Sequence, residues 1–323
     1  MEGGSIVVTG ANGGLGSAIV ERILLDSELA AYTGIFIIRT SAAATNLKQK
    51  LSTAPRTYAY RIIETQLDSI ADVKNTAAKI NSEVGAGTLP PMRAIILAAA
   101  YQDSSELYLT TDGYETTWQI NFLSNFVLVL SLLQSYDKQH NRIVLICSWS
   151  HDAEALDKGS WSTPTEDGSA NAGYRRYAAS KLCAAMFFVK FSFELGEHLA
   201  SDPKLSKVEV VVIDPGAMPT DLGRRGNTIA LFKMKIILPL LATISTYLSP
   251  NGLFHLPSKS AADTIRAAFE LDLPQDEVLY LNGTDKFAAA KETRDLQKRK
   301  ELWQYALQTA CIGGQDTALA QWQ

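Results

Sequence analysis

Short apolar runs alternate with longer segments of helical periodicity along most of the chain. The runs are rich in β-branched residues and lie at 5–9, 34–39, 57–64, 92–98, 142–148 and 208–214. Continuous hydrophobicity of this kind is typical of strands that are buried on both faces. Between them, residues 15–29, 69–84, 111–136 and 177–199 carry a helical pattern. This order predicts an α/β fold, a doubly wound parallel sheet with helices on both sides.

Two stretches interrupt the alternation. Residues 151–173 are polar and rich in Gly, Ser, Asp and Pro, which predicts a long surface loop. Residues 216–257 contain Gly, Pro and an apolar stretch at 229–248, but Lys233, Lys235 and Pro239 lie inside that stretch and disfavour a membrane span. A lid over an apolar pocket and a helix on a membrane surface both remain open for 229–248.

The remaining C-terminal sequence looks helical at 260–270 and 286–310, with a short strand between them at 278–282. No repeat, low-complexity tract or convincing linker divides the chain. We therefore expect residues 1–323 to form a single domain, with an inserted lid at 216–257 and a C-terminal extension at 285–323.

Composition excludes several classes of protein. The 323 residues are 46% apolar and carry a formal charge of -4, which fits a globular protein and gives no broad attraction to nucleic acid. The three cysteines and four histidines are dispersed, so neither a disulfide framework nor a metal site is expected. The first residues carry no secretory pattern, and we expect a cytoplasmic protein, with the open alternative of membrane-surface association through 229–248.

The segment TGANGGLG, residues 9–16, lies between the first predicted strand and the first predicted helix. Glycines there permit a tight turn and let the backbone approach a pyrophosphate at the helix N-terminus. A loose glycine pattern also fits an ordinary strand-to-helix turn. The surrounding strand-helix-strand order favours a dinucleotide site and a Rossmann-type fold.

Arg39 ends the second predicted strand, roughly 20 positions after the last glycine, where such folds contact the ribose of the nucleotide. No Asp or Glu occupies positions 38–41. A guanidinium beside the hydroxyls of Thr40 and Ser41 suits a 2′-phosphate, which a carboxylate would repel. The sequence thus favours NADP(H) over NAD(H), and the alternative is a solvated surface arginine.

Tyr177 and Lys181 are four residues apart and share one face of a predicted helix. We expect the cation to lower the pKa of Tyr177 and to favour its use in proton transfer. Ser148 ends a predicted strand at the carboxyl edge of the sheet, where α/β folds bind ligands. Asn121 lies inside a predicted helix, where its alternative role is a satisfied core amide.

Together these residues resemble the short-chain dehydrogenase/reductase family over about residues 5–285. TGANGGLG corresponds to the family's TGxxxGxG, and Asp214-Pro215-Gly216 corresponds to its PG segment. The residues that match the family's catalytic tetrad are Asn121, Ser148, Tyr177 and Lys181. The resemblance implies cofactor contacts from Thr9, Gly10, Asn12, Gly14, Leu15, Gly16, Arg39, Thr40, Asp68, Ala98, Tyr177, Lys181, Pro215, Gly216 and Thr220.

Further residues resemble one branch of the family, and three alanines depart from the family's pattern. The run Ser148-Trp149-Ser150-His151, the loop before Tyr177 and the LW-containing C-terminal helix resemble the retinol-dehydrogenase-like branch and related fungal reductases. Ala98-Ala99-Ala100 stands where the family has Asn-Ala-Gly. We expect this departure to reduce rigidity or cofactor affinity and to leave the chemistry intact.

The resemblance implies an NADPH-dependent reductase that acts on a ketone or aldehyde of a hydrophobic small molecule, such as a secondary-metabolite intermediate. In that mechanism Tyr177 protonates the alkoxide, Lys181 holds the nicotinamide ribose, Ser148 binds the carbonyl oxygen and Asn121 anchors a water. A retinol-type lipid alcohol dehydrogenase and an NADPH-binding scaffold or sensor with a non-redox role remain as alternatives. Homodimers and tetramers are common in the family.

Overall fold

A computed structural model describes residues 3–103, 106–151, 172–199, 208–222, 236–274 and 278–318, and for 192–199 it describes the backbone only. Its strands form one sheet in the order β3-β2-β1-β4-β5-β6-β7-β8. The strand bounds are β1 Ser5–Thr9, β2 Thr33–Ile38, β3 Tyr60–Glu64, β4 Met92–Leu97, β5 Arg142–Ile146, β6 Glu209–Asp214, β7 Leu279–Asn282 and β8 Asp285–Lys286. Neighbours from β3 to β7 pair in parallel, and β8 adds antiparallel to β7. The predicted Rossmann-type sheet is confirmed.

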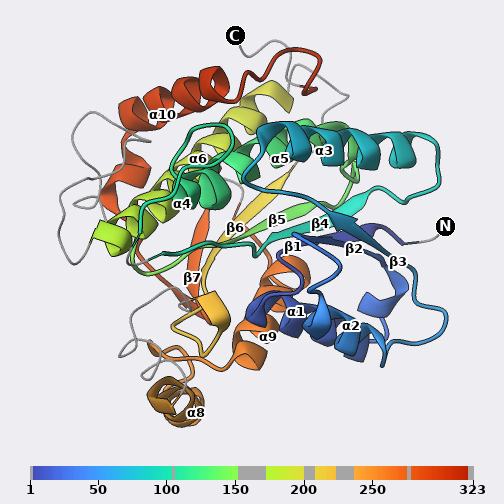
Figure 1. Ribbon diagram of the computed structural model, residues 1–323, viewed down its shortest axis with the longest axis vertical. Helices are drawn as coiled ribbons and strands as arrows, with labels where there is room; N and C mark the ends of the chain where they lie inside the picture. Colours follow the sequence, from blue (N-terminus) through green and yellow to red (C-terminus); the bar gives the residue numbers. More distant parts are fainter. Residues whose placement is uncertain are drawn as a thin grey trace.

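Helices cover both faces of the sheet (Figure 1). One layer holds α1 Gly14–Leu25, α2 Thr45–Leu51 and α9 Pro257–Phe269. The opposite layer holds α3 Ile70–Gly85, α5 Ser124–Ser131 and α6 Ala172–Leu199, with α10 Leu296–Thr309 outside it. Shorter turns are α4 Thr116–Trp118, the π turn η2 Gln119–Leu123, and the 3₁₀ turns η1 Leu29–Ala31, η3 Leu133–Ser135 and η7 Lys291–Arg294.

The core lies on both faces of the sheet because successive strand residues point to opposite sides. Val7 and Ile95 pack into the cluster shared with α3, α5 and α6. Val8 and Ile96, their neighbours in sequence, pack into the cluster shared with α1 and α9. All four side chains are fully buried, which explains why the strands carry unbroken hydrophobic runs.

The C-terminal helix α10 is fixed to the body by an aromatic contact. The ring of Trp303 lies 5.5 Å from the rings of both Phe126 in α5 and Phe187 in α6, measured between centroids. Trp303 itself is buried. The end of the chain therefore covers α5 and α6 on the side away from the sheet.

Several element boundaries differ from the sequence prediction. The helix predicted at 111–136 begins at Thr116 and runs without a gap to Ser131, and it contains a π turn at Gln119–Leu123 between α4 and α5. The predicted helix at 286–310 begins only at Leu296, where the side chain of Asp295 accepts from the N–H of Lys298 (3.0 Å) and caps α10. Helix α6 begins at Ala172, ahead of the predicted start, and residues 152–171 of the predicted loop lie outside the described residues.

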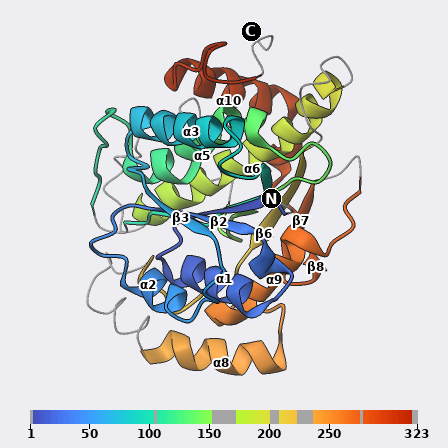
Figure 2. The ribbon, with the colours of Figure 1, turned by 90° about the vertical axis from the view of Figure 1, so that its right-hand side faces the viewer.

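The segment 216–257 is closed at its base. The N–H of Ala217 donates to the carbonyl of Leu253 (2.7 Å), and the N–H of His255 donates back to the carbonyl of Ala217 (3.1 Å). Residues 223–235 lie outside the described residues, and α8 Leu238–Leu248 follows them. Figures 1 and 2 both show α8 beyond the layer of α1 and α9, at the outer end of the molecule.

Helix α8 exposes most of its large apolar side chains. Its buried residues are Leu238 and Ala242, whereas Leu240 is 62% exposed and Tyr247 is 79% exposed. Among the described helices, none is long and apolar enough to cross a bilayer.

Candidate active site

The predicted site residues lie where the parallel strands end. Strands β1 and β4 are neighbours in the sheet, and the chain proceeds outward from them in opposite directions. In doubly wound folds this switch point is where ligands bind, at the carboxyl ends of the strands. Thr9 ends β1, Ala98 follows β4, Ser148 follows β5 and Pro215 follows β6, so the fold brings the separate motifs to one edge.

The glycine loop after β1 is tightly packed. Gly10 has φ +65°, and a Cβ on it would lie 2.7 Å from the Cα of Ala99. A Cβ on Gly16 would collide with the carbonyl oxygen of Gly10. A Cβ on Gly14 would lie 2.6 Å from the Cγ2 of Thr220, so the predicted contact residue after β6 lies directly against this loop. These glycines therefore permit approaches that a larger residue would block.

The N-terminus of α1 offers its backbone N–H groups to this loop. Gly13 is the N-cap and provides no side-chain acceptor, and the first turn of α1 contains no acidic residue. Asn12 fixes the loop from outside, because its Oδ1 accepts from the N–H of Leu47 (3.0 Å) and its Nδ2 donates to the carbonyl of Ala43 (3.0 Å). Leu15 is buried in the core below.

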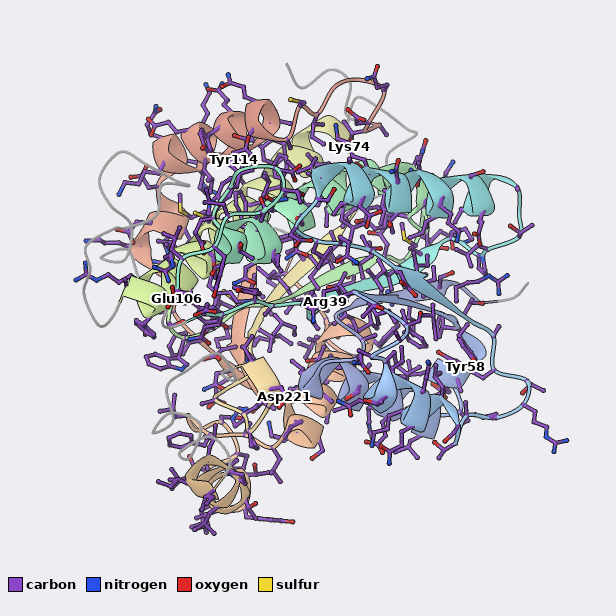
Figure 3. The ribbon with its side chains drawn as sticks, viewed as in Figure 1. Arg39, Tyr58, Lys74, Glu106, Tyr114 and Asp221 are labelled. Carbon is purple, nitrogen blue, oxygen red and sulfur yellow. The ribbon has the colours of Figure 1, made fainter. Side chains whose placement is uncertain are left out.

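Arg39 lies on the loop that leaves β2 and is exposed (Figure 3). Within the described part of the chain, its guanidinium has no ion-pair partner. Lys48 of α2 lies at the same loop, where its Nζ donates to the carbonyl of Ser41 (2.8 Å). The N–H of Ser41 donates to Glu64 (3.0 Å), and hydrogen bonds from Ser41 hold the pKa of Glu64 below its ordinary value. Lys48 was missed at the sequence level because helix α2 was not predicted.

Two further predicted cofactor residues lie close to this edge. Asp68 follows β3 and is partly buried, and its carbonyl accepts from the hydroxyl of Thr111 (3.1 Å). The N–H of Ala99, next to Ala98, donates to the hydroxyl of Thr9 (3.1 Å), which ties the end of β4 to the end of β1. The predicted effect of the three alanines on cofactor affinity stays a prediction.

Asn121 is fully buried in the π turn and joins two parts of the site. Its Oδ1 accepts from the N–H of Tyr101 (2.8 Å), and its Nδ2 donates to the carbonyl of Tyr101 (3.0 Å) and to the hydroxyl of Ser180 (2.9 Å). Ser180 in turn donates to the carbonyl of Tyr177 (2.7 Å). The side chain of Asn121 therefore connects the loop after β4 with the helix that carries Tyr177 and Lys181.

Tyr177 and Lys181 are both buried, with 8% and 2% of their surface exposed. The Nζ of Lys181 donates to the carbonyl of Ile146 (2.8 Å) and lies 5.7 Å from the centroid of the Tyr177 ring. Burial lowers the pKa of Lys181. Burial also raises the pKa of Tyr177, with smaller contributions from Cys147 and Asp214, although a hydrogen bond with Ser148 lowers it.

The pKa of Tyr177 is therefore raised in this structure, opposite to the direction expected from the cation of Lys181 alone. Removing the phenol from water disfavours its anion more than the hydrogen bond with Ser148 favours it. Tyr177 is consequently a neutral phenol at neutral pH, in hydrogen-bonding contact with Ser148. The hydroxyl of Ser148 also accepts from the hydroxyl of Ser150 (2.9 Å).

Asp214 is a buried carboxylate, whereas the sequence pattern indicates it only as part of the PG segment. Its Oδ1 accepts from the N–H of Gly216 (3.0 Å), and it also accepts from the backbone of Trp149. Burial raises its pKa. Asp214 thus holds the loops after β5 and β6 together, and the signal for it was an acidic residue at the end of a buried strand.

Pro215 and Gly216 are held from the base of the 216–257 segment. The carbonyl of Pro215 lies 3.0 Å from the Nδ1 of His255 and accepts from the hydroxyl of Ser260 (2.6 Å). Gly216 has φ +70°, and a Cβ there would lie 2.8 Å from the His255 ring. The close approach of this ring requires glycine.

Comparisons with known proteins agree with this geometry. The family model described as short chain dehydrogenase matches residues 5–158. The chain is 37% identical to short-chain dehydrogenase iccH of Talaromyces variabilis, with 99% of each chain covered. It is 24% identical to retinol dehydrogenase 13 of Mus musculus, over 93% of this chain and 82% of that protein.

The similarity to a solved structure, at low sequence identity, shows the fold alone. The NADPH-bound carbonyl reductase from chicken fatty liver superposes with a TM-score of 0.57 at 17% identity, over 90% of this chain and 100% of that chain. The motifs, the sheet order and the full-length similarity to iccH lead to one conclusion: the chain is an oxidoreductase of the short-chain dehydrogenase/reductase family, whose members use NAD(P)(H), and it belongs to the retinol-dehydrogenase-like and fungal branch of that family.

Proposed function

We propose that this protein is an NADPH-dependent reductase that transfers hydride to the ketone or aldehyde carbon of a hydrophobic small molecule. The observation that carries the proposal is the neutral, buried Tyr177, which is in hydrogen-bonding contact with Ser148 and lies beside Lys181 at the sheet edge that bears the glycine loop. A phenol that keeps its proton is suited to donate it to an alkoxide.

The residues at this edge fit a dinucleotide phosphate. The N-terminus of α1 has no side-chain cap and no acid in its first turn, which suits a pyrophosphate. Arg39 and Lys48 provide two cations for a 2′-phosphate, with the hydroxyl of Thr40 beside them. Thr220 lies against Gly14 and would contact the nicotinamide end. The bound NADPH supplies the hydride.

The chain's own residues then provide the polar half of the reaction. The hydroxyl of Ser148 donates to the substrate carbonyl oxygen and stabilises its developing negative charge. As hydride reaches the carbonyl carbon, Tyr177 Oη gives its proton to that oxygen and an alcohol results. Lys181 provides positive charge beside the tyrosinate. Asn121 holds the loop at Tyr101 against α6. The tyrosinate regains its proton from solvent, along the water that the family resemblance assigns to Asn121.

The hydrophobic substrate class is supported by the segment 216–257. Its base is hydrogen-bonded next to Pro215, and α8 presents exposed apolar side chains. We propose that this segment is a substrate-side lid on a single domain, and that residues 285–323 form a C-terminal extension. Relatives named as fungal short-chain dehydrogenases favour a secondary-metabolite carbonyl, and those named as retinol dehydrogenases favour a lipid carbonyl.

The test follows NADPH absorbance with a panel of all-trans-retinal, decanal and 9,10-phenanthrenequinone. We expect turnover with NADPH by the parent protein. Tyr177→Phe should keep NADPH binding, measured by cofactor fluorescence, and lose about 10²- to 10⁴-fold in kcat. The matched control is Tyr60→Phe, on the exposed surface of edge strand β3, which should retain full activity. Unchanged turnover of Tyr177→Phe would remove Tyr177 from the mechanism.

A further inference from the structure

His151 lies three residues after Ser148 and is 5% exposed. Its Nδ1 is 2.7 Å from the carbonyl oxygen of Ser148. Its Nε2 accepts from the N–H of Ala290, in the segment after β8 (3.0 Å). Its ring stacks on Tyr280 of β7, with centroids 4.7 Å apart and an interplanar angle of 24°. Three distant segments of the chain therefore meet at this histidine.

The contacts fix the tautomer of His151. A peptide N–H can only donate, so the Nε2 that faces Ala290 must carry a lone pair. A neutral imidazole with an unprotonated Nε2 carries its proton on Nδ1. Two oxygens lie near that proton, the carbonyl of Ser148 at 2.7 Å and the hydroxyl of Tyr280 at 3.1 Å from Nδ1. The shorter contact makes His151 a donor to Ser148.

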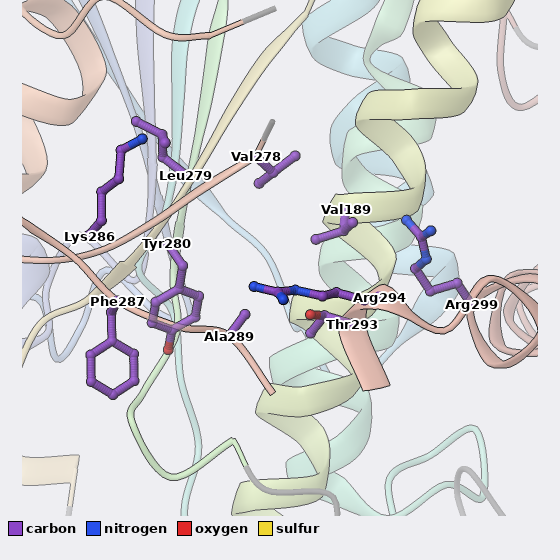
Figure 4. Close-up of a pocket in the computed structure, with 10 residues that line it drawn as sticks. All are labelled: Val189, Val278, Leu279, Tyr280, Lys286, Phe287, Ala289, Thr293, Arg294 and Arg299. Atoms are coloured by element: carbon purple, nitrogen blue, oxygen red, sulfur yellow. The ribbon is translucent and has the colours of Figure 1, made fainter. Parts of the chain in front are cut away.

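Tyr280 supplies a second donor to the same oxygen. Its hydroxyl lies 2.8 Å from the carbonyl oxygen of Ser148 and donates to it. The backbone N–H of His151 also donates to this oxygen at 3.2 Å, so the side chains of His151 and Tyr280, at 2.7 and 2.8 Å, make its two shortest contacts. Figure 4 shows the Tyr280 ring close to Phe287 and Ala289, on the wall of a cavity of about 300 Å³.

Ser148 needs such support because it lies beyond the sheet. Strand β5 ends at Ile146, and the N–H of Cys147 still donates to the carbonyl of Ile213 in β6 (2.7 Å). The carbonyl of Ser148 accepts instead from the side chains of His151 and Tyr280 and, at a longer distance of 3.2 Å, from the backbone N–H of His151. The backbone that carries the Ser148 hydroxyl is therefore positioned by His151 and Tyr280 rather than by a strand partner.

We propose that His151 and Tyr280 are positioning residues that hold the Ser148 backbone for carbonyl binding, and that His151 connects the C-terminal segment at Ala290 to the active site. The inference rests on the proposed function only in assigning substrate binding to Ser148. Neither side chain touches the reacting atoms, so their loss should reduce kcat and leave cofactor affinity unchanged.

Two amide substitutions separate the contacts of His151. The amide of His151→Asn reaches the Nδ1 position and can donate to Ser148, but it cannot reach Ala290. The amide of His151→Gln reaches the Nε2 position, where its oxygen can accept from Ala290, but it leaves the Ser148 carbonyl without this donor. The control is His140→Gln, at an exposed histidine.

We expect His151→Gln and Tyr280→Phe each to lower kcat about tenfold at unchanged KM for NADPH, the size of one lost hydrogen bond in the transition state. His151→Asn should stay within about threefold of the parent, although its melting temperature falls as much as that of His151→Gln. If His151 had only a structural role, the kcat of the two variants would fall in proportion to their melting temperatures. Equal kcat values for the Asn and Gln variants would overturn the proposal.

A spectroscopic measurement tests the arrangement without turnover. ¹⁵N NMR of protein labelled at histidine nitrogens, with His151→Gln to assign the signals, should show His151 neutral and protonated at Nδ1 at neutral pH. Protonation at Nε2, or a charged ring, would overturn the proposed contacts. A parent protein that shows this tautomer and reduces none of the carbonyls would contradict the proposed function and leave the arrangement around Ser148 supported.

Discussion

Replacing Asn121 by Ala tests whether one buried amide holds the two halves of the active site together. In the parent, the side chain makes hydrogen bonds to the N–H and the carbonyl of Tyr101 and to the hydroxyl of Ser180. The alanine would leave the Tyr101 N–H and carbonyl without these partners. Ser180 would keep its bond to the carbonyl of Tyr177.

The magnitude follows from the three hydrogen bonds that are lost. Each contributes about 0.5–1.5 kcal/mol net, so the free energy of unfolding should fall by about 1.5–4.5 kcal/mol. Asn125 is the matched control, because it is also buried and lies one helical turn further along. Its Nδ2 makes a single bond, to the carbonyl of Asn121 (2.9 Å), so Asn125→Ala should cost about 1 kcal/mol from hydrogen bonding.

Urea denaturation of both variants gives the comparison. Each substitution removes the same side-chain atoms from a buried helix, so the difference between the two midpoints isolates the hydrogen bonds. NADPH binding should weaken further in Asn121→Ala than in Asn125→Ala, because only Asn121 reaches both Tyr101 and α6. If Asn121→Ala proves no less stable than Asn125→Ala, the bridging role of Asn121 is refuted.

Three other outcomes are expected. Arg39→Asp should reduce the preference for NADPH over NADH by about 10- to 100-fold, and Lys48→Met should reduce it by less, as measured by initial rates with each cofactor. Equal use of both cofactors by the parent protein would contradict the assignment of NADPH. Burial raises the pKa of Tyr136, so the folded protein keeps the phenol proton at a pH, above about 10, at which the unfolded chain loses it. The melting temperature should therefore fall above about pH 10, and it should fall less steeply in Tyr136→Phe. Replacing Leu240 and Tyr247 of α8 together by Glu should raise KM for retinal if α8 is a lid, whereas loss of phosphatidylcholine vesicle binding at unchanged KM would identify a membrane-surface helix.

The strands were predictable because their burial is continuous. Residues 5–9 and 208–214 were expected as strands and are β1 and β6 to within one residue, since both faces of each strand are covered. Strand β8 was not predicted, because Asp285–Lys286 is an exposed pair with no apolar pattern. It forms through antiparallel pairing with β7, a tertiary contact that local sequence does not encode.

The candidate site was predictable in its members but not in its electrostatics. The helical spacing of Tyr177 and Lys181 correctly placed them near one another, and the pair lies beside Ser148. The direction of the Tyr177 pKa depends on how far the phenol is withdrawn from water, which spacing does not report. Asp214 and His151 were missed as site residues for a related reason, because each contacts a backbone group that is far away in the sequence, Trp149 for Asp214 and Ala290 for His151.

The π turn shows how a local irregularity produces a functional contact. Trp118, Phe122 and Phe126 follow one another along the core side, with ring centroids 5.4 and 6.1 Å apart. A regular helix advances about 100° per residue, so the extra residue of a π turn rotates its neighbours relative to the flanking turns. Asn121, in the middle of the turn, contacts Tyr101 and Ser180 while the aromatic rings stay buried. The side chain of Asn125 donates to the carbonyl of Asn121 within the same turn. The apolar pattern of residues 111–136 predicts a helix but not this turn, since the turn is stabilised by amide contacts that the pattern does not include.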